Sequence, residues 1–468
     1  MAQSARGSYS VKSVDQLNAS ATAPLSQASA KHSRSLRQTS SGLATIMVAY
    51  IIIVVGRVQD IVPVMHVFPM AKIVAALAII VAVQSRPTLS SVSIWSLRPA
   101  RFTILMMGLV AVSILFSVLK HATLGTIMGT SLSVCVGLVL MIKSAVGWND
   151  IRKLLFACVI AALVLALSVE ITRYGSRGGN TGDLDPNDFA FVLDGLLPIL
   201  ITFALVSGRL KRLCYTGASI WVILEILRTE SRGGLLGLLC VVSMMIVLMP
   251  GKQRGRLLPH PSIGTIAARI AILVMAGVLA WHAMPQSARV RFETLRHPDS
   301  GYNTNLNDPT GRFSIWLQTL PLALQRPWGW GAGAFNTVDG KFGGGRYKAA
   351  HNMYLQALIE LGIVGLILFL AALFSSIRNL QSEAFAFPLP VDRDELERRA
   401  FARAMLAGFL GICVSGFFLA ELYSQAIWTL VILSCLVGRS SRVTRDEARP
   451  SKRHRHSLQK PPPMLQGT

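Results

Sequence analysis

One histidine stands where a basic segment of the chain gives way to a long apolar segment. His351 follows Arg346 and Lys348, and it precedes Asn352 and the apolar stretch 353–376. A histidine titrates near neutral pH and is therefore suited to proton transfer. The cations before it would suit an anionic substrate. A lone histidine at a helix start can equally be a capping or interface residue, and the residues alone leave both interpretations open.

Three arginines in other polar segments are candidates for binding the same anion. Arg232 is followed by two glycines, which would let a substrate approach the backbone closely. Arg312 and Arg173 lie in two further segments between apolar stretches. Ionisable residues at a membrane boundary are costly and usually face a cavity or a partner. An ion pair with Glu225 or Glu230 would equally well account for one of the two outer arginines Arg228 and Arg232.

Two aspartates in the segment Asp-Leu-Asp-Pro-Asn-Asp have a spacing that can bind a metal. Asp183 and Asp185 resemble the metal-binding pair of nucleotide-sugar transferases. A helix start is the simpler account, with Asp185 as the N-cap, Pro186 as the first helical residue and Asp188 as the third-position acid. We therefore predict no metal site.

The aromatic and glycine-rich run Trp-Gly-Trp-Gly-Ala-Gly at 328–333 has two interpretations. It could be a flexible turn, or a surface on which a sugar ring stacks while the glycines give access. The residues leave both open.

A helix that begins near His351 would carry glycines on the same face. At about 100° per residue, Gly362 returns to within roughly 20° of the His351 direction, and Gly365 falls close to it. Small residues allow helices to pack tightly in a membrane. We therefore expect a closely packed stripe that fixes the histidine ring, with Glu360 on the opposite side facing another helix.

The elements that position these residues are predicted to be transmembrane helices. The chain is 52% hydrophobic and only 15% charged, and its apolar residues come in blocks of about 20. The net charge of +23 could suggest nucleic acid, but Lys and Arg lie mostly between the apolar blocks and in the tails, so no nucleic-acid partner is predicted. About twelve spans are expected, near 42–57, 64–84, 102–119, 123–142, 153–172, 188–206, 212–228, 233–249, 265–284, 353–376, 402–419 and 423–438.

The basic loops predict the orientation of these spans. Alternate short loops are rich in Lys and Arg, which places them and both termini in the cytoplasm. One long hydrophilic loop then faces the exterior, and loops of that length are usually functional. The predicted organisation is a disordered cytoplasmic tail at 1–41, nine helices in 42–284, a large external loop at 285–352, three helices in 353–438 and a basic cytoplasmic tail at 439–468.

The six cysteines fall inside or at the edge of apolar blocks, and none has metal-ligand spacing. We predict neither a zinc site nor a structural disulfide.

Taken together, these residues resemble the O-antigen ligase and O-antigen polymerase superfamily of bacterial envelopes. His351-Asn352, followed by Gly362 and Gly365, resembles the histidine signature of that superfamily. Arg232 with its two glycines resembles an earlier arginine turn, and Arg312 lies in a segment that resembles the one before the signature. The segment from Asp185 to Ala190 resembles a loop of exopolysaccharide polymerases. The resemblance covers roughly 170–375 closely.

The resemblance implies a metal-independent glycosyltransferase of the C-type membrane fold, without a cofactor, in the bacterial inner membrane. Its donor would be a glycan on undecaprenyl pyrophosphate, and its acceptor a sugar hydroxyl at the periplasmic face. His351 would be the base, Arg232 and Arg312 would stabilise the leaving pyrophosphate, and Arg346 and Lys348 would guide the donor. Asn352 and Arg173 would belong to the same substrate site.

Several alternatives remain open at this stage. The acceptor could be another repeat unit, lipid A–core or a protein Ser or Thr, and fold does not decide among them. The Asp-Pro-Asn-Asp segment slightly favours a polymerase, with which a chain-length regulator could act. A polysaccharide transporter would carry charges in mid-membrane, whereas the notable charges here gather at the outer surface. A structural scaffold would not depend on His351 at all. The basic tails could bind membrane lipids.

Overall fold

A computed structural model describes most of the chain between Gly42 and Ala448. The described residues are 42–62, 65, 68–84, 93–145, 147–172, 178–179, 185–249, 251–253, 256–258, 261–283, 286–293, 311–386 and 392–448. The predicted tail 1–41, Arg173 and Asp183 lie outside these ranges, as does most of the basic tail.

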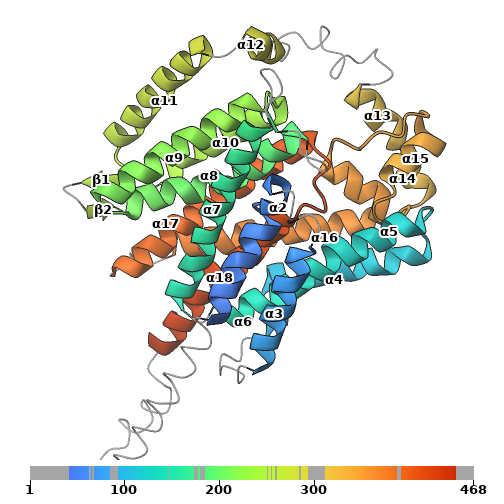
Figure 1. Cartoon of the computed structure of the whole chain (residues 1–468), viewed down its shortest axis with the longest axis horizontal. Coiled ribbons are helices and arrows are strands. Elements are labelled where there is room, and N and C mark those ends of the chain that lie inside the picture. Colours follow the sequence, from blue (N-terminus) through green and yellow to red (C-terminus); the bar gives the residue numbers. More distant parts are fainter. Residues whose placement is uncertain are drawn as a thin grey trace, which may run out of the picture.

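The described part of the chain is helical apart from one short hairpin (Figure 1). Strands β1 (Gly251–Gln253) and β2 (Arg256–Leu258) pair antiparallel between two helices. A first helix, Gly42–Val54, precedes the labelled ones. The others are α2 (Val58–Ile61), α3 (Met70–Gln84), α4 (Arg98–Val112), α5 (Lys120–Thr126), α6 (Leu132–Ser144), α7 (Trp148–Ile171), α8 (Pro186–Val206), α9 (Arg209–Arg228), α10 (Arg232–Leu248), α11 (Ile263–Ala283), α12 (Gln286–Glu293), α13 (Arg312–Thr319), α14 (Leu322–Gln325), α15 (Phe335–Val338), α16 (Met353–Ala384), α17 (Arg393–Ser415) and α18 (Gln425–Ala448).

Six helical segments within the described residues are long and apolar enough to cross a membrane. Five shorter apolar helices accompany them. The chain is thus a polytopic helical membrane protein, as predicted, and the count of twelve spans stays a prediction. The other apolar helices are too short or too charged to be counted as spans. Helix α9 begins with three basic residues among its first four, and several others end before 18 residues. The six long segments are Arg98–Leu115, Lys120–Ser144, Trp148–Ile171, Pro186–Val206, Met353–Ala384 and Arg393–Phe418.

Helix α8 is the centre of the bundle. It packs against α7, α9, α10 and α17 (Figure 1). Nearly all of its residues are buried. A second group forms around α16, which packs against α4, α17 and α18. Because α17 belongs to both groups, it joins the two halves of the bundle.

The start of α8 follows the capping pattern predicted from the sequence. The Asp185 side chain accepts hydrogen bonds from the Asn187 and Asp188 amides at 2.6 and 3.2 Å. The Asp188 carboxylate in turn accepts from the Asp185 amide at 2.9 Å, and Pro186 is the first helical residue. This reciprocal arrangement satisfies amide groups that a helix start leaves without partners. The prediction of a helix start is confirmed.

Helix α16 is broken at Gly362, which has a φ of +72° and a ψ of −169°. The break is filled by the preceding segment 327–331. The Trp330 and Gly331 amides donate to the Ile359 and Glu360 carbonyls at 3.0 and 2.8 Å, and the Ile363 amide donates to the Pro327 carbonyl at 2.9 Å. A Cβ at 362 would lie 2.2 Å from that same carbonyl oxygen, so only glycine fits.

This break corrects the predicted stripe of small residues. The rotation of about 100° per residue holds only for an uninterrupted helix, whereas His351 lies before the helix and Gly362 interrupts it. Glu360 does not simply pair with another span, as the sequence predicted. Its carboxylate accepts hydrogen bonds from the Gly333 and Phe335 amides at 2.7 and 3.1 Å and from the Tyr423 hydroxyl at 2.7 Å.

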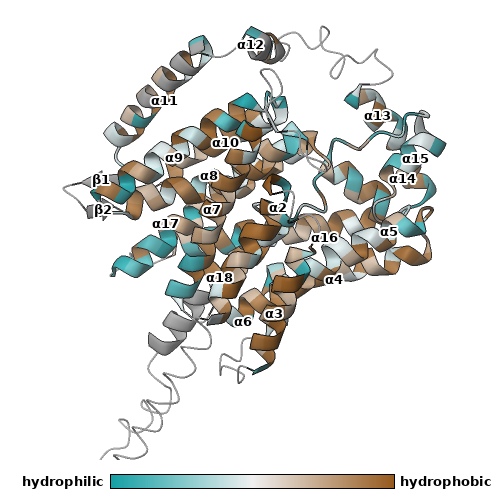
Figure 2. Ribbon diagram, viewed as in Figure 1, coloured by the Kyte–Doolittle hydropathy of each residue, from teal (hydrophilic) through white to brown (hydrophobic). Residues whose placement is uncertain are grey.

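Long helices extend beyond the apolar spans at the end opposite to His351. Figure 2 shows apolar residues over most of the bundle and hydrophilic residues at the start of α17. There the buried Arg398 guanidinium pairs with Glu383 at 2.8 Å, which ties the start of α17 to the end of α16. Arg403 donates to the Ala384 carbonyl from the same side. The residues between the predicted spans 353–376 and 402–419 are therefore largely helical.

Candidate active site

A cavity of about 450 Å³ lies where five separate segments of the chain meet. These are the end of the first helix, the helical turn at Thr130 between α5 and α6, the start of α8, the residues just before α16 and the loop between α17 and α18. His351 lies in its wall, and concave sites with a few polar groups are where ligands usually bind. The titratable side chains that line the cavity are Arg57, Asp185, Asp188, His351, Glu421 and Tyr423.

Two residues of this wall hold a backbone conformation that is rare outside glycine. The φ angle is +46° at His351 and +52° at Arg57. Such a conformation costs on the order of 1–3 kcal/mol and persists where the surrounding structure enforces it, often at functional sites. The fold therefore holds both side chains in the cavity at an energetic cost.

The residues on either side of His351 are fixed by hydrogen bonds. The Trp316 indole N–H donates to the Ala350 carbonyl at 2.8 Å. Asn352 is the N-cap of α16, and its side-chain oxygen accepts from the Tyr354 and Leu355 amides, each at 2.9 Å. The Asn352 oxygen, which the sequence assigned to substrate, is thus used to start the helix. These contacts fix the backbone on both sides of the imidazole.

The surroundings of His351 favour its neutral form. Burial, followed by the nearby Arg312 charge, lowers its pKa from 6.5 to about 4. Lys348 acts in the same direction, while the Asp185 carboxylate acts in the opposite one. At neutral pH the ring is therefore uncharged and has a nitrogen lone pair that can accept a proton.

Three carboxyl groups share the cavity with the histidine. Glu421 is partly buried, and burial followed by the charge of the neighbouring Asp188 raises its pKa well above its usual value. Asp188 and Glu421 are hydrogen-bonded to each other, with Asp185 close by. Two adjacent carboxyls that share a proton can both donate to and accept from a sugar hydroxyl.

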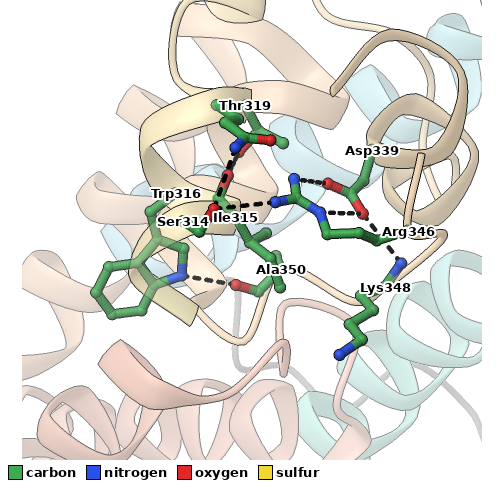
Figure 3. A network of polar contacts seen from close by, with 9 residues as sticks. Ser314, Ile315, Trp316, Thr319, Asp339, Arg346, Lys348 and Ala350 are labelled. Carbon is green, nitrogen blue, oxygen red and sulfur yellow. Dashed lines mark hydrogen bonds and ion pairs between the residues drawn. The ribbon is translucent and has the colours of Figure 1, made fainter. Parts of the chain in front are cut away.

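Arg346 is held by a buried carboxylate (Figure 3). Its guanidinium forms an ion pair with Asp339, and it also donates to the Ser314 hydroxyl at 3.3 Å. The same carboxylate accepts from the Lys348 amide at 3.1 Å. In Figure 3 the Lys348 ammonium points away from this network. Arg346 thus anchors the segment that leads to His351, and Lys348 keeps its charge near the ring.

The two signature arginines each begin a helix. Arg312 is the first residue of α13, and its charge acts on His351. Arg232 is the first residue of α10, behind the Ser231 N-cap. A Cβ at Gly234 would lie 2.4 Å from the Ala190 Cβ, so the start of α10 packs directly against the first turn of α8. Neither arginine is among the residues that line the cavity itself.

The charge of Arg228 is balanced within the protein. Its guanidinium contacts Glu225 and Glu170, each at 2.6 Å. The interpretation of an outer arginine as the partner of Glu225 is therefore correct for Arg228.

The run 328–333 is part of the folded core. Trp330 is buried and its indole N–H donates to the Leu322 carbonyl at 3.1 Å, while the Arg326 guanidinium lies 4.3 Å from its ring centroid. Gly331 has a φ of +106°, and a Cβ there would meet the Ser117 side chain at 2.2 Å. The flexible-turn interpretation is wrong because these glycines allow close packing. Only Trp328 presents an exposed ring.

Sequence reasoning did not select Glu421 or Arg57 as site residues. Both lie in short loops far from His351 along the chain, and each is a charged residue beside an apolar span. That position was the available signal, since charges at a membrane boundary usually face a cavity or a partner. Arg57 also forms an ion pair with Asp60.

Within the described residues, no group of three or more His, Cys, Asp or Glu is placed to hold a metal ion. The six cysteines, all of which lie in that part of the chain, are free thiols.

Comparison with known proteins assigns a family to the region around His351. Residues 217–370 match the family model described as O-antigen ligase. No curated protein matches the chain significantly. The matched region contains Arg232, Arg312 and His351, whereas Asp185 and Glu421 lie outside it. The match confirms the resemblance predicted from the sequence: residues 217–370 carry a domain of the O-antigen ligase and O-antigen polymerase superfamily.

Proposed function

We propose that the protein transfers a glycan from undecaprenyl pyrophosphate to a sugar hydroxyl at the periplasmic face of the bacterial inner membrane. The observation that carries this proposal is a neutral, strained and anchored His351 in a polar cavity, with the Arg312 charge beside it. It lies within the O-antigen ligase domain. Both termini would then be cytoplasmic, as the basic loops indicate.

In the proposed reaction His351 accepts the proton of the acceptor hydroxyl. The hydroxyl oxygen forms a bond to the anomeric carbon, and the bond from that carbon to the pyrophosphate oxygen breaks. The electron pair leaves with the pyrophosphate, whose added charge Arg312 and Arg232 stabilise. Attack from the side opposite to the leaving group inverts the anomeric carbon. Because the bound donor is anionic, it also raises the pKa of His351 and makes it a stronger base.

The other residues of the site have supporting roles in this proposal. Arg346 and Asn352 are positioning residues that fix the backbone around His351. Lys348 attracts the anionic donor, as does Arg173, and the pair of Asp188 and Glu421 orients acceptor hydroxyls. No step requires a metal or a cofactor.

We place polymerisation of an exopolysaccharide or O-antigen first, because Asp185 and Asp188 of the polymerase-like segment line the cavity. Ligation to lipid A–core comes second, and the matched family description favours it. A protein Ser or Thr would be a third acceptor. A chain-length regulator would be a partner only in the first case.

Reconstitution of the full chain in liposomes would test the function. The donor is a labelled oligosaccharide on undecaprenyl pyrophosphate, offered with more of itself, with lipid A–core or with a Ser/Thr peptide. Products of increasing length support a polymerase, and labelled lipid A–core supports a ligase. Movement of intact donor across the bilayer without release of undecaprenyl pyrophosphate would show a transporter and refute the proposal.

The loss of activity at acid pH is expected at a pH far below the pKa of an ordinary histidine. His351 must be neutral to accept a proton, and its pKa of about 4 means that this form is lost only under strongly acidic conditions. For the donor, kcat/KM reports the free protein and should stay constant as the pH falls from 7 to about 5. Lys348→Gln removes a charge that lowers this pKa, so its acid limb should move to higher pH.

Measurement of kcat/KM in buffers that span the ordinary histidine pKa of 6.5 and the lowered pKa of about 4 checks this expectation. Lys341→Gln is the control, because Lys341 is exposed and is not among the charges that act on His351. An acid limb centred near 6.5 in the unaltered protein would contradict the described environment.

Loss of the Glu421 side chain is expected to weaken use of the acceptor. Glu421→Ala leaves Asp188 without its hydrogen-bonded neighbour and should lower kcat/KM for the acceptor by about tenfold or more. Glu421→Gln keeps a donor of similar shape and should stay within about threefold of the original value. Glu170→Ala, which removes an exposed partner of Arg228, is the matched control. Equal activity of all three variants would exclude Glu421 from the site.

A further inference from the structure

A second cavity, of about 400 Å³, opens at the far end of the bundle. It lies between the first helix, the first turns of α7 and α9, and the end of α8. Three of its side chains are cationic and four are large and apolar or aromatic. The residues that line it are Thr45, Val48, Asn149, Arg152, Lys153, Phe156, Phe203, Ser207, Lys211 and Tyr215.

Helix α8 connects this cavity to the one that contains His351. Its N-cap, Asp185, lines the first cavity, and Phe203 and Ser207 at its other end line the second. At 1.5 Å per residue its 21 residues span about 31 Å, which matches the hydrocarbon thickness of about 30 Å. The two cavities therefore face opposite surfaces of the membrane.

The second cavity is suited to an anion. Arg152 contacts Glu397 at 2.9 Å and Lys153 contacts Asp150 at 3.4 Å, but both basic side chains remain about two-fifths exposed. The Glu397 and Asp150 side chains are only 5% and 13% exposed, so the open side of each pair is the cation, which can contact a second anionic group. Lys211 adds a third, exposed charge from α9.

The carbonyl end of α8 does not cancel this positive charge. Arg212 donates to the Ser207 carbonyl at 2.9 Å and to the Ala204 carbonyl at 3.3 Å, which offsets the negative end of the helix. Helices α7 and α9 begin at the cavity with glycine N-caps that supply no side-chain acceptor. The cationic side chains and the two helix starts therefore both favour binding of an anion.

The rest of the wall is suited to hydrocarbon. The rings of Phe156 and Tyr215 each lie 5.7 Å from the Phe203 ring, centroid to centroid. Phe156 is 38% exposed, and Leu213 on α9 is 71% exposed, so apolar surface continues outward from the rings. A free phosphate would contact only the cationic side chains, whereas a phospholipid would contact the cations with its phosphate and the apolar wall with its acyl chain.

We propose that this cavity binds the phosphodiester head group of an anionic phospholipid, such as phosphatidylglycerol, from the leaflet opposite to His351. The cations contact the phosphate and the rings contact the first part of an acyl chain, as in other basic pockets between membrane helices. This site is separate from the proposed transfer reaction and does not depend on it.

Native mass spectrometry of the full chain, released from detergent, would test the proposal. The probes are phosphatidylglycerol and phosphatidylcholine with the same acyl chains. The unaltered protein should retain phosphatidylglycerol preferentially. The double variant Lys153→Gln/Lys211→Gln should weaken that binding by roughly tenfold or more. The control Lys143→Gln/Arg209→Gln removes two exposed charges from the same end of the bundle, outside the cavity, and should bind normally.

Three outcomes would overturn the proposal. Equal retention of both lipids would show that charge is not recognised. Unchanged binding in the cavity variant, at an unchanged melting temperature, would place the lipid elsewhere. Displacement of bound lipid by inorganic phosphate at comparable concentration would show that the cavity recognises a free anion instead.

Discussion

Replacement of His351 by alanine is expected to lower glycan transfer by about 10²- to 10⁴-fold, the usual contribution of a general base. The neutral ring is held in the cavity by strained backbone and by anchored neighbours on both sides. Without it, the acceptor hydroxyl must lose its proton to water. In cells, single lipid-linked repeat units should accumulate while long chains disappear, if the protein is a polymerase.

The lipid-linked glycan, the secreted polysaccharide and lipid A from the same cells would be compared on gels at equal protein levels. His121→Ala is the matched control, since His121 is an exposed histidine at the start of α5 and does not line the cavity. Accumulation of long lipid-linked chains with bare lipid A would indicate a ligase. Unaltered glycan pools in cells with His351→Ala would remove the histidine from the mechanism.

Replacement of Arg312 by glutamine is expected to slow transfer by about 10³-fold, by analogy with arginines that stabilise phosphate charge in transition states. Its guanidinium is the cation whose effect on His351 is the largest. Arg312→Lys should recover part of the rate, because an ammonium keeps the charge but loses the planar fork that fits phosphate oxygens. Donor binding should weaken less than kcat falls, since the added charge appears only as the pyrophosphate leaves.

Single-turnover rates and donor affinity, measured separately, distinguish these effects. Because Arg312 also lowers the pKa of His351, the acid limb of Arg312→Gln should move to higher pH. Arg326→Gln serves as the control, since Arg326 stacks on Trp330 instead of acting on the histidine. Loss of donor binding with an unchanged single-turnover rate would assign Arg312 to recognition alone.

The sequence was most informative where local rules decide the structure. Apolar block length predicted helices that cross a membrane, and the order Asp185, Pro186, Asp188 predicted a helix start that forms as expected. Both depend on residues close together in the chain. The position of His351 before a long helix was equally readable, because the change from polar to apolar residues occurs there.

Other features depend on contacts that no local rule contains. The rotation argument for Gly362 assumed a continuous helix, but the segment 327–331 supplies backbone partners that stabilise a break. Likewise, the Arg346 guanidinium is held by an ion pair with Asp339. Glu421 reaches the cavity because α17 and α18 pack around α16. These depend on tertiary structure, so spacing along the chain could not reveal them.

The break in α16 has a consequence for biogenesis. Residues 353–384 could enter the bilayer as one uninterrupted helix of about 48 Å, which is longer than the hydrocarbon layer. They take their final shape only when 327–331, synthesised earlier, dock at Ile359, Glu360 and Ile363. In the proposed orientation, that segment must first be translocated across the membrane. A chain whose segment 311–343 failed to cross would then contain an inserted bundle with an unassembled cavity, so assembly of the cavity would depend on translocation of this loop.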